Sequence, residues 1–290
     1  MKRVWRWIGV ALGAVVALAI VAFAIVYLLS EHIIGRRYEV PTQAVQIPTD
    51  PTEIIEGRRL ATVHGCLNDC HGRQAEGRVM FDHPLIARIV APNLTSAVRR
   101  YTDAQLTAII RRGVRPDGRS VVVMPSEAFV ALTDADLGRI LAYLKNLPVS
   151  VGPGPSVSVG PAGRLGVVAG KFKTAAELLA EATPPPEATG EEASFGRYVA
   201  RTTCGPCHGS DLRGASNPDF TSPSLQVVAA YSPQAFTQLL RTGVALGDRQ
   251  LPVMSPQARE CLSQLTDAEI SSLYAYLHAM PGAARPSGAP

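Results

Sequence analysis

The sequence predicts an all-α protein in which two similar helical segments follow a single membrane-spanning helix at the N-terminus. An uncharged run of 22 residues, positions 8 to 29, predicts the membrane helix. Two later segments carry the same helix starts and stops in the same order, and Val123-Met124 recurs as Val253-Met254, 130 positions later. Neither segment shows the apolar and polar alternation of a β-sheet protein, so both read as helices joined by long loops.

Length and composition exclude several other classes. A chain of 290 residues with 47% hydrophobic and 18% charged residues is long enough for about two domains. The net charge of +4 is spread along the chain without a long basic run, so no nucleic-acid footprint is visible. Of the 5 cysteines, four form two close pairs, each followed directly by histidine, which points to a cofactor.

The N-terminal run is long enough to cross a bilayer. As a helix, Ile8 to Leu29 would reach about 33 Å, against about 30 Å for the hydrocarbon core. Aromatic and basic residues flank it: Trp5, Trp7, Tyr27, Lys2, Arg3 and Arg6. The basic residues precede the run and should stay cytoplasmic. The alternative is a cleaved signal peptide, but its small-x-small site, Ala22 to Ala24, lies inside the apolar run. Both interpretations export everything after residue 35.

The rest of the chain divides by composition. We expect a membrane anchor at residues 1–30, a linker at 31–52, a first helical domain at 53–149, a Pro/Gly-rich linker at 150–190, a second helical domain at 191–282 and a tail at 283–290. The first linker contains three prolines and no helical period, which favours an extended spacer that lifts the first domain off the membrane. The second contains one short helical pattern near 174–182.

Helix-end signals recur in both segments. Thr102 and Gln105 are spaced as a capping box, and Ser232-Pro233 is a helix start in the matching place. The same two helices should end at Gly113 and Gly243. The last helix of each segment begins after a threonine, Thr133 or Thr266.

Two cysteine clusters carry the chemistry. Cys204 and Cys207 precede His208 in a C-x-x-C-H motif, the pattern of covalent haem attachment. Its first copy has one more residue between Cys70, which precedes His71, and its partner Cys66, so one of its two thioether bonds could be strained or absent. A thioredoxin-like pair would need a βαβ context, and a zinc ribbon would need more ligands at close spacing.

A haem iron held by one histidine needs a second ligand or an open position, and a ligand used in both copies should lie at matched positions. Only Met124 and Met254 qualify, and each precedes the last helix of its segment. Methionine is usually a core filler, so the matched offset is what favours ligation. The remaining candidates have no matched partner and are expected to have packing or surface roles: Met80, His64, His83 and Cys261. Glu127 near Met124 is best explained as a solvated loop carboxylate.

At residues 53–148 and 191–282 the sequence resembles the class I cytochrome c family, through C-x-x-C-H, a following proline, a methionine loop and a threonine-capped last helix. The whole is similar to membrane-anchored dihaem c-type cytochromes of bacteria. The resemblance implies that Pro92 and Pro223 give their carbonyl oxygens to the axial histidines. It also implies that the first and last helices of each domain cross at glycine, Gly57 and Gly196, near Tyr143 and Tyr276.

The resemblance implies a dihaem electron carrier with two covalently bound haem c groups, not an enzyme. Its partners would be a redox donor and acceptor (a dehydrogenase, another cytochrome or an oxidase), with the haem domains on the periplasmic or outer face of the bacterial cytoplasmic membrane. A haem subunit of a dehydrogenase or oxidase complex and a free-standing carrier fit equally well. The alternative is a dihaem peroxidase, in which one iron would be open beside a distal acid such as Glu127.

Overall fold

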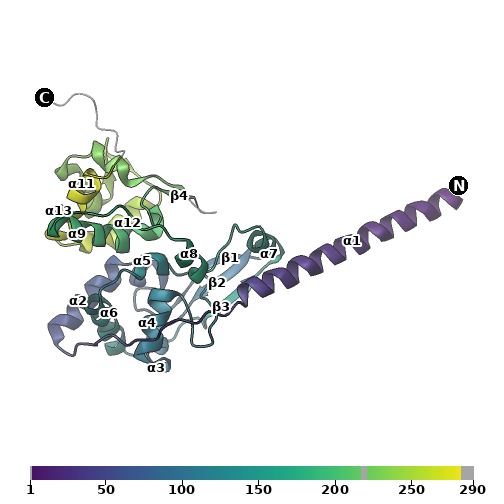
Figure 1. Cartoon of the computed structure of the whole chain (residues 1–290), viewed down its shortest axis with the longest axis horizontal. Coiled ribbons are helices and arrows are strands. Elements are labelled where there is room, and N and C mark those ends of the chain that lie inside the picture. Colours follow the sequence, from purple (N-terminus) through teal and green to yellow (C-terminus); the bar gives the residue numbers. More distant parts are fainter. Residues whose placement is uncertain (1, 217–220, 282–290) are drawn as a thin grey trace.

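The computed structural model describes residues 2–216 and 221–281, and Figure 1 shows their arrangement. Helix α1 (Lys2–Ile34) projects alone from the folded body. Its 33 residues are long and apolar enough to cross a membrane, and none of its most apolar stretch is buried against the rest of the protein. Length and composition alone leave both the anchor and the signal-sequence interpretations of α1 open.

The first helical unit follows α1 and has its own core. It consists of α2 (Pro51–Val63), a tight turn at Cys66–Cys70, α3 (Leu94–Arg100), α4 (Asp103–Arg112), α5 (Ser126–Phe129) and α6 (Asp134–Asn146). Helices α2 and α6 pack side by side. Fully buried side chains of α6, among them Leu137 and Leu141, lie at the centre of this core.

The second helical unit repeats this order with a separate core. It consists of α9 (Glu191–Val199), a turn at Ala200–Cys204, α10 (Gly205–His208), a short helix at Leu225–Ala230, α11 (Pro233–Thr242), α12 (Met254–Glu260), a turn at Leu262–Gln264 and α13 (Asp267–His278). Two short antiparallel strand pairs lie between the helices: β4 (Ala215–Ser216) with β5 (Thr221–Ser222), and β6 (Val244–Ala245) with β7 (Arg249–Gln250). Leu273 and Leu277 of α13 are buried in this core, at the positions that match the buried Ile140 and Leu144 of α6.

The helix ends confirm the sequence signals. The Thr102 hydroxyl accepts the Gln105 N–H at 3.3 Å, and Ser232 caps α11 in the same way. Helices α4 and α11 end at Gly113 and Gly243, which both adopt the left-handed conformation that favours glycine. These local signals place the same two helices in each unit.

The crossing of the first and last helices at glycine is also confirmed. A Cβ atom on Gly57 would lie 1.9 Å from the carbonyl oxygen of Arg139 in α6. A Cβ atom on Gly196 would lie 2.0 Å from the carbonyl oxygen of Ser272 in α13. In both units the backbones therefore approach more closely than any side chain permits.

The all-α prediction is wrong for one part of the chain. Strands β1 (Arg78–His83) and β2 (Ala87–Ala91) form an antiparallel hairpin, and β3 (Ser156–Val159) adds to β2 with Ala87 opposite Val159. The sheet joins the first unit to the segment predicted as a Pro/Gly-rich linker. The prediction failed because these strands are short and because β2 and β3 pair across a large separation in sequence. No local alternation of apolar and polar residues therefore indicates them.

Both predicted linkers lie against the folded body. Residues 150–190 contain α7 (Pro161–Val168) and α8 (Ala175–Glu181) besides β3, and they pack on α1 and α5 respectively. In residues 31–52, Val45 is buried in the first core, and a Cβ on Gly138 would meet the Gln46 carbonyl oxygen at 2.2 Å. That segment is extended, but it covers the first unit and does not act as a free spacer. The predicted tail at 283–290 lies outside the described residues.

Candidate functional site

The two cysteine clusters are held by different local structures. In the first, α2 ends at Val63, and Asn68, with a positive φ of 64° and a ψ of −52°, departs from helical geometry and absorbs the extra residue between the cysteines. The turn is closed by the His71 N–H, which donates to the Cys66 carbonyl oxygen at 3.1 Å. The longer spacing is therefore accommodated without opening the loop.

The second cluster lies on continuous helical backbone, in which a π-helical turn leads into α10. Cys204 ends the turn that follows α9, and Cys207 and His208 lie in α10, with Pro206 in its first turn. Proline at this position costs no hydrogen bond and presets the helical backbone. The two cysteines are thus spaced by about one helical turn, as the motif predicts.

Each histidine has its ring fixed by a proline carbonyl, as the resemblance implied. The Nδ1 atom of His71 lies 2.8 Å from the carbonyl oxygen of Pro92, and that of His208 lies 2.9 Å from that of Pro223. A carbonyl oxygen only accepts, so Nδ1 carries the proton and Nε2 keeps its lone pair. Burial lowers the pKa of both rings, which keeps them neutral at pH 7. Each Nε2 atom is therefore available to bind a metal.

One continuous cavity of about 1710 Å³ unites the predicted site. Its walls include all ten candidate residues: Cys66, Cys70, His71, Pro92, Met124, Cys204, Cys207, His208, Pro223 and Met254. Met124 lies in the loop before α5, and Met254 is the first residue of α12. A pocket for one small ligand measures about 300–1,000 Å³, so this cavity has room for two.

Burial keeps the thiols of the two clusters protonated. None of the five cysteines forms a disulfide, and burial raises the pKa of Cys66 and Cys204 to about 12. Within residues 2–216 and 221–281, no group of three or more His, Cys, Asp or Glu side chains could hold a metal ion.

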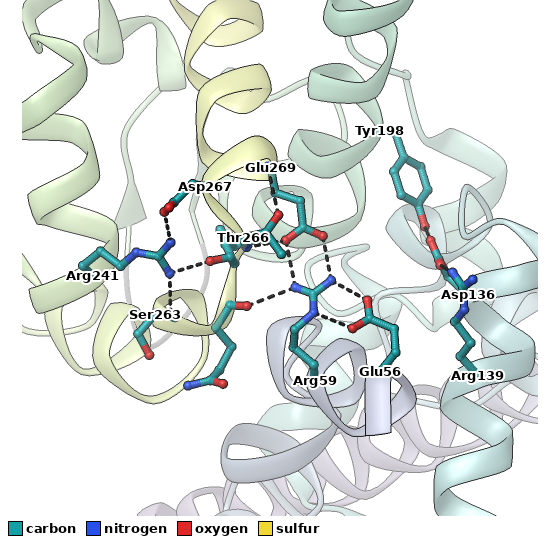
Figure 2. Close-up of polar contacts among 12 residues, drawn as sticks. Glu56, Arg59, Asp136, Arg139, Tyr198, Arg241, Ser263, Thr266, Asp267 and Glu269 are labelled. Carbon is teal, nitrogen blue, oxygen red and sulfur yellow. Dashed lines mark hydrogen bonds and ion pairs between the residues drawn. The ribbon is translucent and has the colours of Figure 1, made fainter. Parts of the chain in front are cut away.

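An ion-pair network joins the two helical units, as Figure 2 shows. The Arg59 guanidinium, on α2, donates to both carboxylate oxygens of Glu269 on α13 at 2.8 and 2.9 Å. It also donates to both oxygens of Glu56 at 2.6 and 2.9 Å and to the Gln264 carbonyl oxygen at 3.0 Å. Beside it, the Tyr198 hydroxyl of α9 donates to Asp136 of α6. This interface fixes α2 relative to the second unit.

The same interface brings the two cysteine loops together. Directly after α2, the Nδ1 atom of His64 donates to the Thr202 carbonyl oxygen at 3.3 Å, two residues before Cys204. In the first loop, the Asn68 side-chain amide donates to the Glu260 carbonyl oxygen of α12 at 2.9 Å. The two halves of the cavity are therefore joined next to the cysteines.

Sequence reasoning missed the arginines of the site. Five of them line the cavity: Arg100, Arg115, Arg119, Arg164 and Arg249. Arg119 and Arg249 lie 130 positions apart, the offset that also relates Met124 to Met254, so this shared spacing could have revealed them, whereas the other three have no arginine at the matching position. Guanidinium groups suit the recognition of carboxylates.

The residues expected to have packing or surface roles lie as follows. Met80 lines the cavity wall, Cys261 is fully buried, His83 is exposed, and His64 is buried between the two units. The interpretation of Glu127 as a solvated carboxylate is wrong. Glu127 is partly buried on α5, and its Oε2 atom has no hydrogen-bond partner among the described residues. Burial raises its pKa, and it is not among the described residues that line the cavity.

The residues present fit a covalently attached haem. Each half of the cavity offers two protonated thiols beside an imidazole Nε2 with a free lone pair. The wall is mainly apolar, with arginines that suit the carboxylates of such a group. Each methionine thioether contacts the apolar core of its own unit as well as the cavity.

Comparison with known proteins supports a c-type cytochrome. Residues 193–281, which make up most of the second unit, match the family model for cytochrome c. The fructose dehydrogenase cytochrome subunit of Gluconobacter japonicus is 25% identical over 273 residues, which cover 82% of this chain and 56% of the relative. The chain therefore spans about half the length of the curated relative that it matches. The second unit contains a cytochrome c domain, which implies covalently bound haem c.

Proposed function

We propose that this chain is a membrane-anchored dihaem c-type cytochrome that carries single electrons and catalyses no reaction of its own. The observation that carries the proposal is a repeated hydrogen bond. One cavity contains two Cys–His clusters, and in each cluster the histidine Nδ1 is held by a proline carbonyl oxygen. The geometry recurs although the first cluster has a different cysteine spacing. The proposal therefore extends to both units, beyond the matched residues 193–281.

The proposed roles divide among the ten cavity residues. Cys66, Cys70, Cys204 and Cys207 would form the thioether bonds. His71 and His208 would bind iron through Nε2, and the carbonyl oxygens of Pro92 and Pro223 hold those rings in one orientation. Met124 and Met254 would complete each coordination sphere through sulfur, which raises the reduction potential.

A haem with two protein ligands supplies one-electron redox chemistry. The chain's task is then to keep both ligands in place while the charge changes. The histidine rings are fixed by their carbonyl bonds, and Met124 and Met254 pack against the two cores. With these ligands held rigid, the structural change on electron transfer would be small, and a haem bound by both ligands would leave no position for a substrate.

The proposed location is the outer face of a bacterial cytoplasmic membrane. The apolar stretch of α1 would be an uncleaved single-pass anchor, with Lys2, Arg3 and Arg6 on the cytoplasmic side. The relative is named as the cytochrome subunit of a dehydrogenase. We propose accordingly that this chain accepts electrons from a dehydrogenase, as its haem subunit or as a separate partner, and passes them to another cytochrome or an oxidase.

Haem counting tests the proposal. The intact mass of the purified chain, after acid-acetone extraction of non-covalent haem, should show two haem additions. Changing both Cys66 and Cys70 to Ala should remove one addition, and Cys204→Ala with Cys207→Ala should remove the other. The matched control is Cys261→Ala, a buried thiol that should leave both. A single addition that survives the Cys66 and Cys70 changes would restrict haem to the second unit.

Peroxide kinetics separate the carrier from a dihaem peroxidase. The reduced chain should pass electrons readily to a soluble cytochrome or oxidase, while its oxidation by hydrogen peroxide stays slow even after half-reduction. Rapid peroxide turnover in the half-reduced state, lost in Glu127→Gln, would contradict the carrier.

A further inference from the structure

Helix α7 has an apolar residue at every position except one. Its outward face consists of Pro161, Ala162, Leu165 and the following Ala169, all of them exposed, with 57% of Leu165 open to solvent. An exposed helix of a soluble domain normally turns a polar face to water. The outward face of α7 contains no polar side chain, so its exposure to water is unfavourable.

The single charged residue of α7 joins it to α1. Arg164 donates to the Ser30 hydroxyl at 2.9 Å and to the Glu31 carboxylate at 2.6 Å. Its guanidinium also lies 4.0 Å from the centre of the Tyr27 ring. These contacts fix α7 to residues 27–31 of α1, the stretch in which the uncharged run ends.

The tip of the β1–β2 hairpin extends the same apolar face. The Leu85 carbonyl oxygen accepts the Ala162 N–H at 2.8 Å, and the Ile86 carbonyl oxygen accepts the Gly160 N–H at 2.8 Å. A Cβ atom on Gly163 would lie 2.0 Å from the Ile86 carbonyl oxygen. The hairpin tip and α7 are thus one rigid piece, and 59% of the Leu85 side chain is exposed on it.

We infer that Leu85, Pro161, Ala162, Leu165 and Ala169, here called the α7 patch, rest in the headgroup region of the bilayer. The inference depends on the proposed anchor. Tyr27 would lie at the membrane interface, where such rings prefer to lie, and Arg164 holds the patch at that level. In Figure 1, α7 lies at the end of the body from which α1 projects. Glu31 of α1 pairs with Arg164, and Asp82 of β1 pairs with Arg88, so the negative charge of both carboxylates is compensated toward an anionic lipid surface.

The contact would orient the folded body on the membrane. A single helix leaves the body free to rotate and tilt, whereas a second contact beside it fixes one face toward the lipid. The sheet that carries the hairpin tip also contributes Ile89 and Val157 to the cavity wall. The first candidate haem site would therefore be held at a constant height above the bilayer.

Photo-crosslinking in lipid tests this inference. Leu165, Ile55 and Leu18 are each replaced, one at a time, by benzoylphenylalanine in the full chain. The variants are reconstituted in vesicles of phosphatidylcholine and phosphatidylglycerol, illuminated, and analysed for lipid adducts by mass spectrometry. Ile55, 70% exposed on α2, is the matched control away from α7, and Leu18, 70% exposed on α1, reports on the anchor itself. The haem absorption spectrum checks that each variant is folded.

Lipid adducts several-fold more abundant at position 165 than at 55, together with adducts at 18, are the expected result. Adducts at 18 with none at 165 would overturn the α7 contact and leave the anchor intact. Absence of lipid adducts at 18 would overturn the anchor and, with it, the inference. Protein-to-protein crosslinks from 165 in place of lipid adducts would mean that a second chain covers the patch, which also overturns it.

Discussion

Each candidate haem histidine has one nitrogen committed to a backbone carbonyl and the other left with its lone pair. The repetition of this arrangement in both units, at 2.8 and 2.9 Å, is the strongest residue-level sign of function. Sequence could indicate the histidines from their place after the cysteines. The two prolines followed only from the resemblance, because nothing in their spacing alone assigns a carbonyl to a ring.

Replacing the second candidate methionine tests ligation. In Met254→Ala the sulfur is lost, so we expect the near-infrared sulfur-to-iron band to fall by half and one midpoint potential to drop by on the order of 0.1 V, within the roughly 0.8 V that axial ligands span. Optical spectra and a redox titration measure both. The control is Met80→Ala, which removes another methionine of the cavity wall and should change neither. An unchanged spectrum in Met254→Ala would reduce Met254 to a packing role.

Acid sensitivity should come in part from His64. Burial lowers its pKa from 6.5 to about 4, so between these pH values the unfolded chain binds a proton that the folded chain does not. The contribution is complete above about pH 6.5, and the free energy of unfolding falls by up to about 1.4 kcal/mol per pH unit as the pH drops through this window. Denaturant unfolding at several pH values measures the slope.

His64→Gln should flatten that slope and keep a donor for the Thr202 carbonyl. The matched control is His83→Gln, because His83 is exposed and should not contribute to the slope. Equal slopes in the wild type and in His64→Gln would assign the acid sensitivity to other groups.

At the scale of elements, each unit depends on one pair of helices that cross at glycine. In Gly196→Ala the new methyl group would meet the Ser272 carbonyl oxygen, a backbone atom that cannot rotate away. Helices α9 and α13 must separate, which should lower the free energy of unfolding by about 3 kcal/mol. Thermal unfolding measures the loss. In Gly154→Ala, where nothing lies within 4 Å of the new atom, stability should hardly change. Equal stability of the two variants would show that the helix crossing can accommodate a methyl group.

Elements with local signals were predictable, and elements made by distant pairing were not. Helix α4 begins at a capping box and ends at glycine, so its limits follow from about a dozen neighbouring residues. Strand β3 forms only because Ser156 to Val159 pair with β2, which lies far earlier in the chain. Helix α7 has no capping residue with a side-chain hydrogen bond and few polar positions, so its sequence resembles a linker. The all-α prediction therefore failed at β3, and the linker prediction failed at α7.

At the scale of the whole molecule, the arrangement of the two units depends on Arg59. Its bidentate pair with Glu269 is largely shielded, with side-chain exposures of 20% and 12%. In Arg59→Met the glutamate loses this partner, so we expect a loss of about 1–3 kcal/mol and faster hydrogen exchange in α13. Thermal unfolding and exchange mass spectrometry measure these effects. Arg58→Met, at the exposed neighbouring position, is the control. A fully stable Arg59→Met would mean that apolar contacts such as Val63 against the second core hold the units together.

Because both cysteine loops lie along one cavity, the two proposed haem sites would be close enough to affect how electrons pass through the molecule. With both sites loaded as proposed, an electron arriving at either centre can equilibrate with the other before any partner removes it. The two haems together would then store two electrons, accepted one at a time. Oxidation of an organic molecule by a dehydrogenase commonly releases electrons in twos, whereas a haem accepts them singly. A carrier of this design would reconcile the two stoichiometries within a single chain, without a second encounter between the partners.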